Sequence, residues 1–499
     1  MGPSRDILNR RPAERVDNID MSKVQVIERY PLFLGGEFHE TDRHCTISLP
    51  FDAMPVAQVF EGDAATMDRA IACAVEGAKL MAALTNAERS DMLFRLHALM
   101  TAELEDFARV IVNETGKPIK EARGEAERTL QTLLASAMEA RNLRGEVIPM
   151  EGAPSAKGKM AITVREPLGV IGAITPFNVP LNTAMHKIGP ALAGGNAVVH
   201  KPAEETPLSA LRLAQAMVHA GVPKGAYNVV CGDGATLGQQ LVADPRVAMI
   251  TFTGSVPVGK AIRAAAGLKR VTLELGSNSA VIIEPDADID LAVARAVAGS
   301  FGHSGQLCIS VQRIYVHESI ADPFLDKFAA ATRKLRGGHP YDEASDYSSL
   351  ITEEAAVRVD SWIEEAVAHG ARRVTGGPRV RATIPPTILE NVPLTAKLAC
   401  QEVFGPVVAV NRYGDLDEAI RLTNDTPYGL QAGIFTRDML RAFEAARKLK
   451  VGGVMINEVP TFRADHMPYG GVKESGQGRE GPRYAIEEMT ELKLICWKI

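Results

Sequence analysis

The spacing of apolar positions divides the chain into helical and strand-like stretches. Between 63 and 144, apolar side chains recur every three or four positions, as at Leu93 and Leu96, which predicts helices there. From 169 onward, short apolar runs predict buried strands at 169–174, 197–200, 227–230, 249–252 and 271–275. Helices are predicted between these strands at 208–220, 235–242 and 256–266. Alternating strands and helices predict a parallel sheet wound by helices.

A second alternating series extends from 279 to 460. Its apolar runs predict strands at 280–283, 314–316, 407–410, 433–435 and 454–456. Helices are predicted at 289–298, 323–335, 353–369 and 437–448. Proline and glycine are dense between 377 and 395, which predicts a loop.

Two stretches fit neither series. Residues 147–168 and 489–499 alternate polar and apolar positions. We expect them to form strands that project from the body of the protein. Exposed strand edges of this kind invite pairing with another subunit.

Length, composition and charge restrict the class of protein. The chain has 499 residues, enough for two or three domains, and 46% of them are hydrophobic, so a large core can form. The net charge is −6, without a basic block, which makes nucleic acid an unexpected partner. No apolar run reaches the roughly 18 residues that a membrane helix needs. Residues 1–27 lack the apolar core of a secretory signal and are expected to be a tail.

The six cysteines are dispersed along the chain, without a CxxC pair. This pattern argues against a disulfide framework and against a zinc site, and it favours a reducing compartment. We therefore expect a soluble cytoplasmic protein that binds no metal.

Three polar residues in separate loops suggest covalent acyl chemistry. Cys308 lies in Gly305-Gln306-Leu307-Cys308, Glu274 closes an apolar strand before Gly276, and Asn178 lies in Thr175-Pro176-Phe177-Asn178. A thiol, a carboxylate and an amide can supply a nucleophile, a base and an oxyanion donor. Taken singly, each has an ordinary alternative: a small buried side chain, a strand-end carboxylate facing water, and a turn residue.

Two other loops are suited to a dinucleotide. Phe252-Thr253-Gly254-Ser255 follows a strand and opens a helix, where backbone N–H groups can face a pyrophosphate. Lys201 and Glu204 follow the strand at 197–200, where they can hold ribose hydroxyls. A solvated loop is the alternative interpretation of this second segment.

Taken together and in this order, the motifs resemble those of the aldehyde dehydrogenase superfamily over residues 30–499. The matching segments are TPFN at 175, KPAE at 201, FTGS at 252, ELGSNS at 274, GQLC at 305, EVFGPV at 402 and PYGG at 468. The resemblance implies an α/β fold with a Rossmann-type cofactor domain (28–146 and 169–275) and an α/β catalytic domain (276–484). It also implies a small β oligomerisation domain (147–168 and 485–499), and hence a homodimer or homotetramer.

The same resemblance assigns roles to individual residues. Cys308, Glu274 and Asn178 correspond to the catalytic positions of the family. The implied NAD contacts are Ile174, Thr175, Pro176, Phe177, Lys201, Glu204, Gly234, Phe252, Gly254, Ser255, Val258, Leu275, Glu402 and Phe404. A carboxylate at Glu204 accepts a ribose 2′-hydroxyl and repels a 2′-phosphate, so NAD is expected over NADP, which stays possible.

The segment 457–469 narrows the expected substrate. It resembles a subgroup that includes lactaldehyde, phosphonoacetaldehyde and non-phosphorylating glyceraldehyde-3-phosphate dehydrogenases. A small aldehyde, hydroxylated or anionic, is expected, with Arg128, Arg463, Leu307 and Ile309 as substrate contacts. A planar guanidinium suits an anion, although structural ion pairing is an alternative role for both arginines.

This chain departs from the family pattern at several positions. Phe177 replaces the usual tryptophan, and Leu307 stands where anionic-substrate relatives often place another arginine. Gly276-Ser277-Asn278 replaces Gly-Gly-Lys, and the Cβ of Ser277 could narrow the site. The presence of Glu274 favours thioester hydrolysis. Transfer to coenzyme A and a catalytically silent scaffold are the alternative functions.

Overall fold

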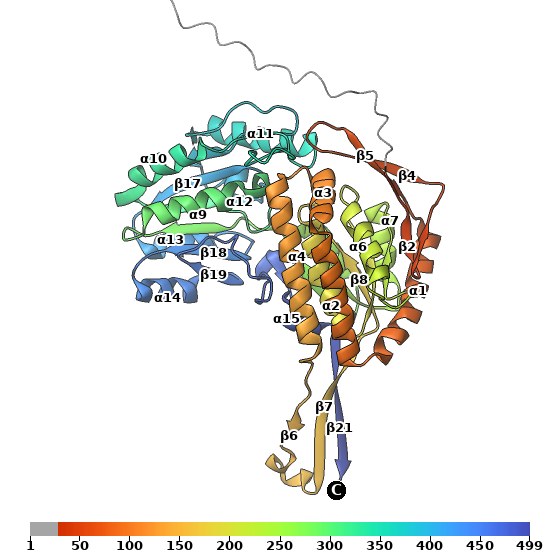
Figure 1. Cartoon of the computed structure of the whole chain (residues 1–499). Helices are drawn as coiled ribbons and strands as arrows, with labels where there is room; N and C mark the ends of the chain where they lie inside the picture. Colours follow the sequence, from red (N-terminus) through yellow and green to blue (C-terminus); the bar gives the residue numbers. More distant parts are fainter. Residues whose placement is uncertain (1–27) are drawn as a thin grey trace, which may run out of the picture.

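The computed structural model of the chain describes residues 28–499. The expected tail at 1–27 lies outside the described residues. Figure 1 shows two lobes, each built around a sheet, and a narrow arm that extends away from both. This arrangement of wound sheets confirms the predicted α/β architecture.

The first lobe contains an eight-stranded sheet in the order β20-β12-β11-β8-β9-β10-β2-β3. Its central strands are parallel: β12 (Arg270–Glu274), β11 (Val247–Thr253), β8 (Val170–Ile174), β9 (Ala197–Lys201) and β10 (Tyr227–Val229). Antiparallel strands complete it: β20 (Gly476–Gln477), β2 (Leu32–Leu34) and β3 (Glu37–His39). The chain passes outward from β8 to β10 and then returns to form β11 on the other side of β8. The strand order therefore reverses between β8 and β11, where open α/β sheets bind ligands.

Helices cover both faces of this sheet, and alternate strand residues enter two separate apolar cores. Ile171 and Val198 pack in one core with α2 (Asn86–Ala102), α3 (Leu104–Thr115), α4 (Ile119–Ala140), α5 (Pro180–Ala193) and α6 (Leu208–His219). Val170 and Val199 pack in the other with α1 (Ala64–Ala83), α7 (Gly234–Ala243) and α8 (Val256–Ala265). A strand buried on both faces carries a continuous apolar run, which is why the sequence revealed all five parallel strands.

The second lobe contains a seven-stranded sheet in the order β15-β16-β17-β14-β13-β18-β19. Its strands are β15 (Arg372–Arg373), β16 (Thr387–Glu390), β17 (Val407–Tyr413), β14 (Arg313–His317), β13 (Ala280–Ile283), β18 (Gln431–Phe435) and β19 (Gly453–Ile456). Its helices are α9 (Ile289–Phe301), α10 (Ala321–Thr332), α11 (Glu353–Ala368), α12 (Lys397–Cys400), α13 (Leu416–Asn424) and α14 (Met439–Lys448), and α15 (Pro482–Glu488) leads back to the first lobe.

The prediction of a loop across 377–395 was wrong in part, because β16 lies within it. The four residues of this strand are all buried and pair in parallel with β17. Pro385 and Pro386 precede the strand directly and hid it in the sequence.

The arm consists of β6 (Val147–Ile148), β7 (Lys159–Pro167) and β21 (Thr490–Lys498). β7 pairs with β21 in antiparallel register along its whole length, which confirms the strands predicted in both stretches. Its exposed apolar side chains include Leu494 and Trp497. A separate three-stranded sheet near the start of the described chain is formed by β1 (Glu28–Tyr30), β5 (Pro55–Phe60) and β4 (His44–Ser48). Among residues 28–499, no helix has the length and apolarity needed to cross a bilayer.

Candidate active site

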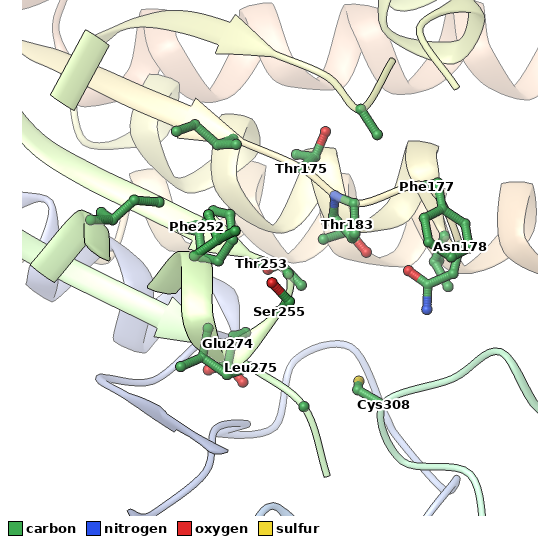
Figure 2. Close-up of a pocket in the computed structure, with 18 of the residues that line it drawn as sticks. Thr175, Phe177, Asn178, Thr183, Phe252, Thr253, Ser255, Glu274, Leu275 and Cys308 are labelled. Carbon is green, nitrogen blue, oxygen red and sulfur yellow. The ribbon is translucent and has the colours of Figure 1, made fainter. Parts of the chain in front are cut away.

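A cavity of about 1090 Å³ opens at the carboxyl ends of β8, β11 and β12 and extends to the loops of the second lobe. Every catalytic, cofactor and substrate residue selected from the sequence lines this cavity. Figure 2 shows Asn178 and Cys308 facing each other across it, with Glu274 at the end of its strand. The structure therefore brings the predicted residues into one site.

Cys308 lies in the loop between α9 and β14. The preceding turn, Gly302–Gly305, holds His303, Ser304 and Gly305 in the left-handed region, with φ angles of 47°, 53° and 73°. This unusual backbone places the partly buried Cys308 side chain at the cavity wall, where its Sγ lies 3.1 Å from the hydroxyl of Tyr469. Burial of the sulfur raises the pKa of the thiol to about 12. The resting sulfur is therefore a neutral thiol at physiological pH.

Asn178 is held just before the start of α5 by one contact of its side chain and one of its backbone carbonyl. Its side-chain Nδ2 donates to the carbonyl oxygen of Gln306 at 2.7 Å, which fixes the amide with nitrogen toward the Cys308 loop. Its backbone carbonyl accepts from the buried Lys117 at 2.9 Å. Lys117 is itself ion-paired with the buried Glu125. An amide has two N–H groups, so the second can point to an oxygen on a carbon attached to Cys308.

Glu274 ends β12 and is almost fully buried. Within residues 28–499 neither of its carboxylate oxygens has a hydrogen-bond partner. Burial raises its pKa well above the ordinary value, and the nearby charge of Glu480 raises it further. A carboxylate of this kind is a strong base when it is ionised, because no donor stabilises its charge.

Glu480 has the opposite environment although it is equally buried. Lys187 on α5 donates to it at 2.8 Å, and Arg463 donates at 3.1 Å. Burial alone would raise its pKa, but Lys187 and Arg463 outweigh that effect and hold the pKa at about 2. Lys187 also donates to Thr253 at the end of β11, at 2.7 Å. Glu480 therefore carries the negative charge of this cluster.

The end of the cavity near β9 and β11 has features that fit a dinucleotide. Glu204 accepts the backbone N–H of Gly234 at 2.8 Å, and its Oε1 lies 4.0 Å from the Nζ of the buried Lys201. α8 starts after Ser255 without a side-chain cap, so its first backbone N–H groups remain available to an anion.

Glu402 marks the other end of the region that would hold the cofactor. It accepts the N–H of Ser277 at 2.8 Å, and burial raises its pKa to about 7. A Cβ on Gly276 would lie 2.5 Å from its Oε2, so a larger residue there would displace this carboxylate from its present position. The side chain of Ser277 does not narrow the cavity: its hydroxyl lies 3.0 Å from that of Ser279 and it is absent from the cavity wall. The rings of Phe177 and Phe404 meet edge to face, with centroids 5.7 Å apart.

Both predicted substrate arginines carry ion pairs and also line the cavity. Arg128 on α4 binds both oxygens of Asp465, at 3.2 and 2.9 Å, and its side chain is 41% exposed. The carboxyl of Asp465 also accepts from His186 at 3.1 Å. Arg463 lies above the ring of Tyr469, 3.7 Å from guanidinium carbon to ring centroid, and its Nε has no partner among residues 28–499.

Sequence patterns had not revealed Lys187, Glu480, Tyr469 or Asp465 as members of this site. Lys187 was hidden because α5 itself was missed. This helix begins with Pro180 and contains Pro190, and nearly all of its residues are buried, so its polar positions do not mark a solvent-exposed face. Tyr469 and Asp465 lie in segments used to identify the family, but their contacts depend on the fold.

Comparison with known proteins decides the family. The model of the aldehyde dehydrogenase family matches residues 38–495. This chain belongs to that family. It is 46% identical over 475 residues to the 3-sulfolactaldehyde dehydrogenase of Priestia aryabhattai, covering 95% of this chain and 99% of that protein. These findings confirm the family resemblance drawn from the motifs.

Two solved structures extend the comparison to the fold. Aldehyde dehydrogenase 21 of Physcomitrella patens, in complex with the reaction product succinate, has a TM-score of 0.92 at 38% identity, covering 94% of this chain and 98% of that chain. Glyceraldehyde-3-phosphate dehydrogenase of Methanocaldococcus jannaschii, complexed with NADP, has a TM-score of 0.89 at 38% identity, covering 92% and 100%. The aldehyde dehydrogenase fold is confirmed, and the protein is an NAD(P)-dependent aldehyde dehydrogenase.

Proposed function

We propose that this enzyme oxidises a small, anionic, hydroxylated aldehyde to its carboxylic acid, with Cys308 as nucleophile and NAD as the preferred cofactor. The observation that carries the choice of substrate is the position of Arg463. Its guanidinium stacks on the ring of Tyr469, and the hydroxyl of the same tyrosine contacts the Cys308 sulfur. A fixed positive charge therefore lies close to the nucleophile. Arg128 adds a second guanidinium on the cavity wall.

Named ligands of related proteins support this choice. The similar protein from Priestia is named for a sulfonated aldehyde, and the Physcomitrella structure holds a dicarboxylate product. Arginine binds sulfonate, phosphonate or carboxylate oxygens with two parallel hydrogen bonds. Leu307 and Ile309, on either side of Cys308, would contact the apolar part of the substrate.

Each catalytic residue has a step that its position supports. The Cys308 sulfur attacks the aldehyde carbon, and the Asn178 amide together with the Cys308 backbone N–H holds the oxyanion that forms. One donor of this kind typically contributes roughly 3–4 kcal/mol to lowering the barrier. NAD, when bound, supplies the acceptor for the hydride that leaves this carbon. A thioester then remains on Cys308, and ionised Glu274 removes a proton from the water that hydrolyses it.

The proposed cofactor contacts divide between the two ends of the cavity. Lys201, Glu204 and Gly234 would hold the adenosine ribose, and the start of α8 at Gly254 and Ser255 would face the pyrophosphate. Glu402 and Phe404 would flank the nicotinamide ribose and ring. Ile174, Thr175, Pro176, Phe177, Phe252, Val258 and Leu275 would form the remaining contacts. The carboxylate of Glu204 supports NAD over NADP, because it would repel a 2′-phosphate.

We also propose a homo-oligomer in which the arm of β6, β7 and β21 lies in the interface. Leu492, Leu494, Ile495 and Trp497 on β21 are 41–60% exposed, and exposed apolar side chains on both faces of one strand indicate a contact surface. The domain division proposed from the sequence assigns this arm to oligomerisation, 28–146 and 169–275 to the cofactor, and 276–484 to catalysis. The unpaired cysteines support a cytoplasmic location.

A matched pair of aldehydes tests the substrate proposal. 3-Sulfolactaldehyde and lactaldehyde differ only in the sulfonate, so the ratio of their kcat/KM values measures recognition of the anion. We expect the sulfonated aldehyde to be favoured at least tenfold, and Arg128→Gln to remove most of that preference. The control is Arg123→Gln on the same helix, because Arg123 pairs with Glu105 and Glu343 instead of lining the cavity. Equal kcat/KM values for the two aldehydes in the unaltered enzyme would exclude anion recognition.

Two further measurements address the alternative functions. Product analysis with and without coenzyme A separates hydrolysis from acyl transfer, and Glu274 favours the free acid. NADH formation by Cys308→Ala tests the nucleophile, because another nucleophile would make this change neutral, whereas a silent scaffold would form no NADH in the parent or the variant. Unchanged turnover in that variant would contradict the assignment of Cys308.

A further inference from the structure

Tyr469 makes the only side-chain hydrogen bond to the Cys308 sulfur in the part of the chain that the structure describes, at 3.1 Å. Its ring is 3% exposed and lies in the loop between β19 and β20. Two backbone hydrogen bonds with Glu480, at 3.0 and 2.7 Å, fix this loop on the first lobe. The fold therefore holds the Tyr469 hydroxyl against the sulfur, because the side chain is buried and its loop is fixed.

The surroundings of Cys308 otherwise disfavour a thiolate. Glu402 and Glu274 are the acidic groups near the sulfur, and each of them, when ionised, disfavours a negative charge on it. Arg463 is the cation that favours the charge, and its guanidinium lies over the face of the Tyr469 ring. Burial of the sulfur disfavours the thiolate further, because the charged form loses its contact with water. A nucleophilic sulfur in this position needs a hydrogen-bond donor in direct contact.

The ring of Tyr469 is placed so that its hydroxyl is a strong donor. Arg463 lies over its face at 3.7 Å and is anchored on its other side by Glu480 at 3.1 Å. A cation on the face of a phenol ring draws electron density from it and strengthens the O–H dipole. Burial keeps the pKa of the Tyr469 phenol well above its ordinary value, so the hydroxyl retains its proton. Tyr469 therefore stays a donor over the whole working pH range.

We propose that Tyr469 is a catalytic residue whose hydroxyl donates to the Cys308 sulfur and stabilises its thiolate form. This inference depends on the proposed role of Cys308 as nucleophile. In the first step the S–H bond breaks, its proton passes to water in the cavity, and the sulfur accepts the hydrogen bond from Tyr469. The S–C bond then forms while the C=O π electrons move to the aldehyde oxygen. In hydrolysis the S–C bond breaks, its electron pair returns to the sulfur, and the same hydroxyl stabilises the departing thiolate.

Alkylation of Cys308 by iodoacetamide measures the thiolate directly, without aldehyde or cofactor. The rate is followed by mass spectrometry of the Cys308 peptide as a function of pH, which separates it from the other cysteines. We expect Tyr469→Phe to slow alkylation at neutral pH about tenfold. The control is Tyr484→Phe, a tyrosine on α15 outside the cavity wall, which should leave the profile unchanged. An unchanged profile in folded Tyr469→Phe would overturn the proposal.

A second variant decides the question if Tyr469→Phe does not fold. Fluorotyrosine incorporated at position 469 keeps the shape of the ring and makes the phenol a stronger donor. Alkylation at neutral pH should then become faster than in the parent, and an equal or slower rate would contradict a donor role. The nucleophile is tested separately by Cys308→Ala: full turnover in that variant would refute the proposed function, whereas its inactivity beside a parental Tyr469→Phe profile would refute only the role of Tyr469.

Discussion

Glu274 and Glu480 act on each other in one buried charge cluster, but only Glu480 has hydrogen-bond partners. Lys187 and Arg463 bind Glu480 at 2.8 and 3.1 Å, whereas both oxygens of Glu274 are without partners among residues 28–499. Two interacting carboxylates in such different environments do not ionise together. Glu480 takes the charge, and its charge in turn keeps the proton on Glu274. Glu274, the base of the proposed reaction, therefore ionises only as the pH approaches its raised pKa.

Substitution of Glu480 should lower the pKa of Glu274. A carboxylic base works only when ionised, so the rate of hydrolysis should rise as the pH increases through the raised pKa of Glu274. Glu480→Gln removes the like charge and leaves Lys187 and Arg463 free to favour ionised Glu274, which lowers its pKa. We expect the acidic limb of the kcat profile to move to lower pH. The measurement is kcat against pH at saturating aldehyde and cofactor.

The exposed Glu488→Gln on α15 is the matched control, since it removes an equal charge outside the cluster. Its acidic limb should coincide with that of the parent. An acidic limb that stays in place, or moves to higher pH, in Glu480→Gln would contradict repulsion by Glu480 as a cause of the raised pKa of Glu274.

Replacement of Glu274 should stabilise the fold while it abolishes hydrolysis. In the unfolded chain a glutamate ionises near its ordinary pKa of about 4.3. In the fold its pKa is raised, so folding takes up a proton between these two pKa values, and stability falls as the pH rises through that window. Glu274→Gln removes the ionisable group, and we expect a gain of about 1–3 kcal/mol toward the alkaline end. Chemical denaturation at several pH values measures it; a gain that does not grow with pH would contradict the raised pKa.

The sequence revealed strands that are buried on both faces but not the buried charges between the lobes. β8 to β12 are continuous apolar runs, and such runs are recognisable without a structure. α5 was missed although it carries Lys187 and begins two residues after Asn178, because it contains Pro180 and Pro190 and most of its polar side chains are buried. Cys308, Glu274 and Asn178 were found through motifs in three loops. Their arrangement in one cavity could not be derived, since it depends on how two sheets far apart in sequence pack together.

Contacts between individual side chains could not be predicted from the sequence for a different reason. Arg463 was selected as a substrate contact, but its stacking on Tyr469 and its ion pair with Glu480 depend on the path of the loop between β19 and β20. Replacement of Arg463 would therefore disturb the nucleophile and the charge cluster together. Arg128 is the better position for testing recognition of the anion, because its partner Asp465 also receives hydrogen bonds from His186 and Asn182.

Cofactor preference should depend on Glu204. Its carboxylate lies at the start of α7 and accepts the N–H of Gly234, and its side chain is 54% exposed. Glu204→Gln keeps an acceptor for Gly234 but removes the charge that would repel a 2′-phosphate. We expect kcat/KM for NADP to rise about tenfold relative to NAD. Glu205→Gln is the control, because it removes an equal charge one residue away from the Gly234 contact; an equal change in both variants would mean that general charge, and not this carboxylate, sets the preference.

Gly276 should control the position of Glu402 and, through it, the affinity for the cofactor. A Cβ at this position would lie 2.5 Å from Oε2 of Glu402, while the neighbouring Ser277 N–H binds the other oxygen at 2.8 Å. The carboxylate in Gly276→Ala must move, because it is the end of a flexible side chain, and it would then lose that hydrogen bond. We expect the Kd for NAD, measured by calorimetry without aldehyde, to rise at least fivefold. Gly124→Ala on α4 is the matched control, since a Cβ there has no heavy atom within 4 Å. An unchanged Kd in Gly276→Ala would mean that Glu402 does not hold the cofactor.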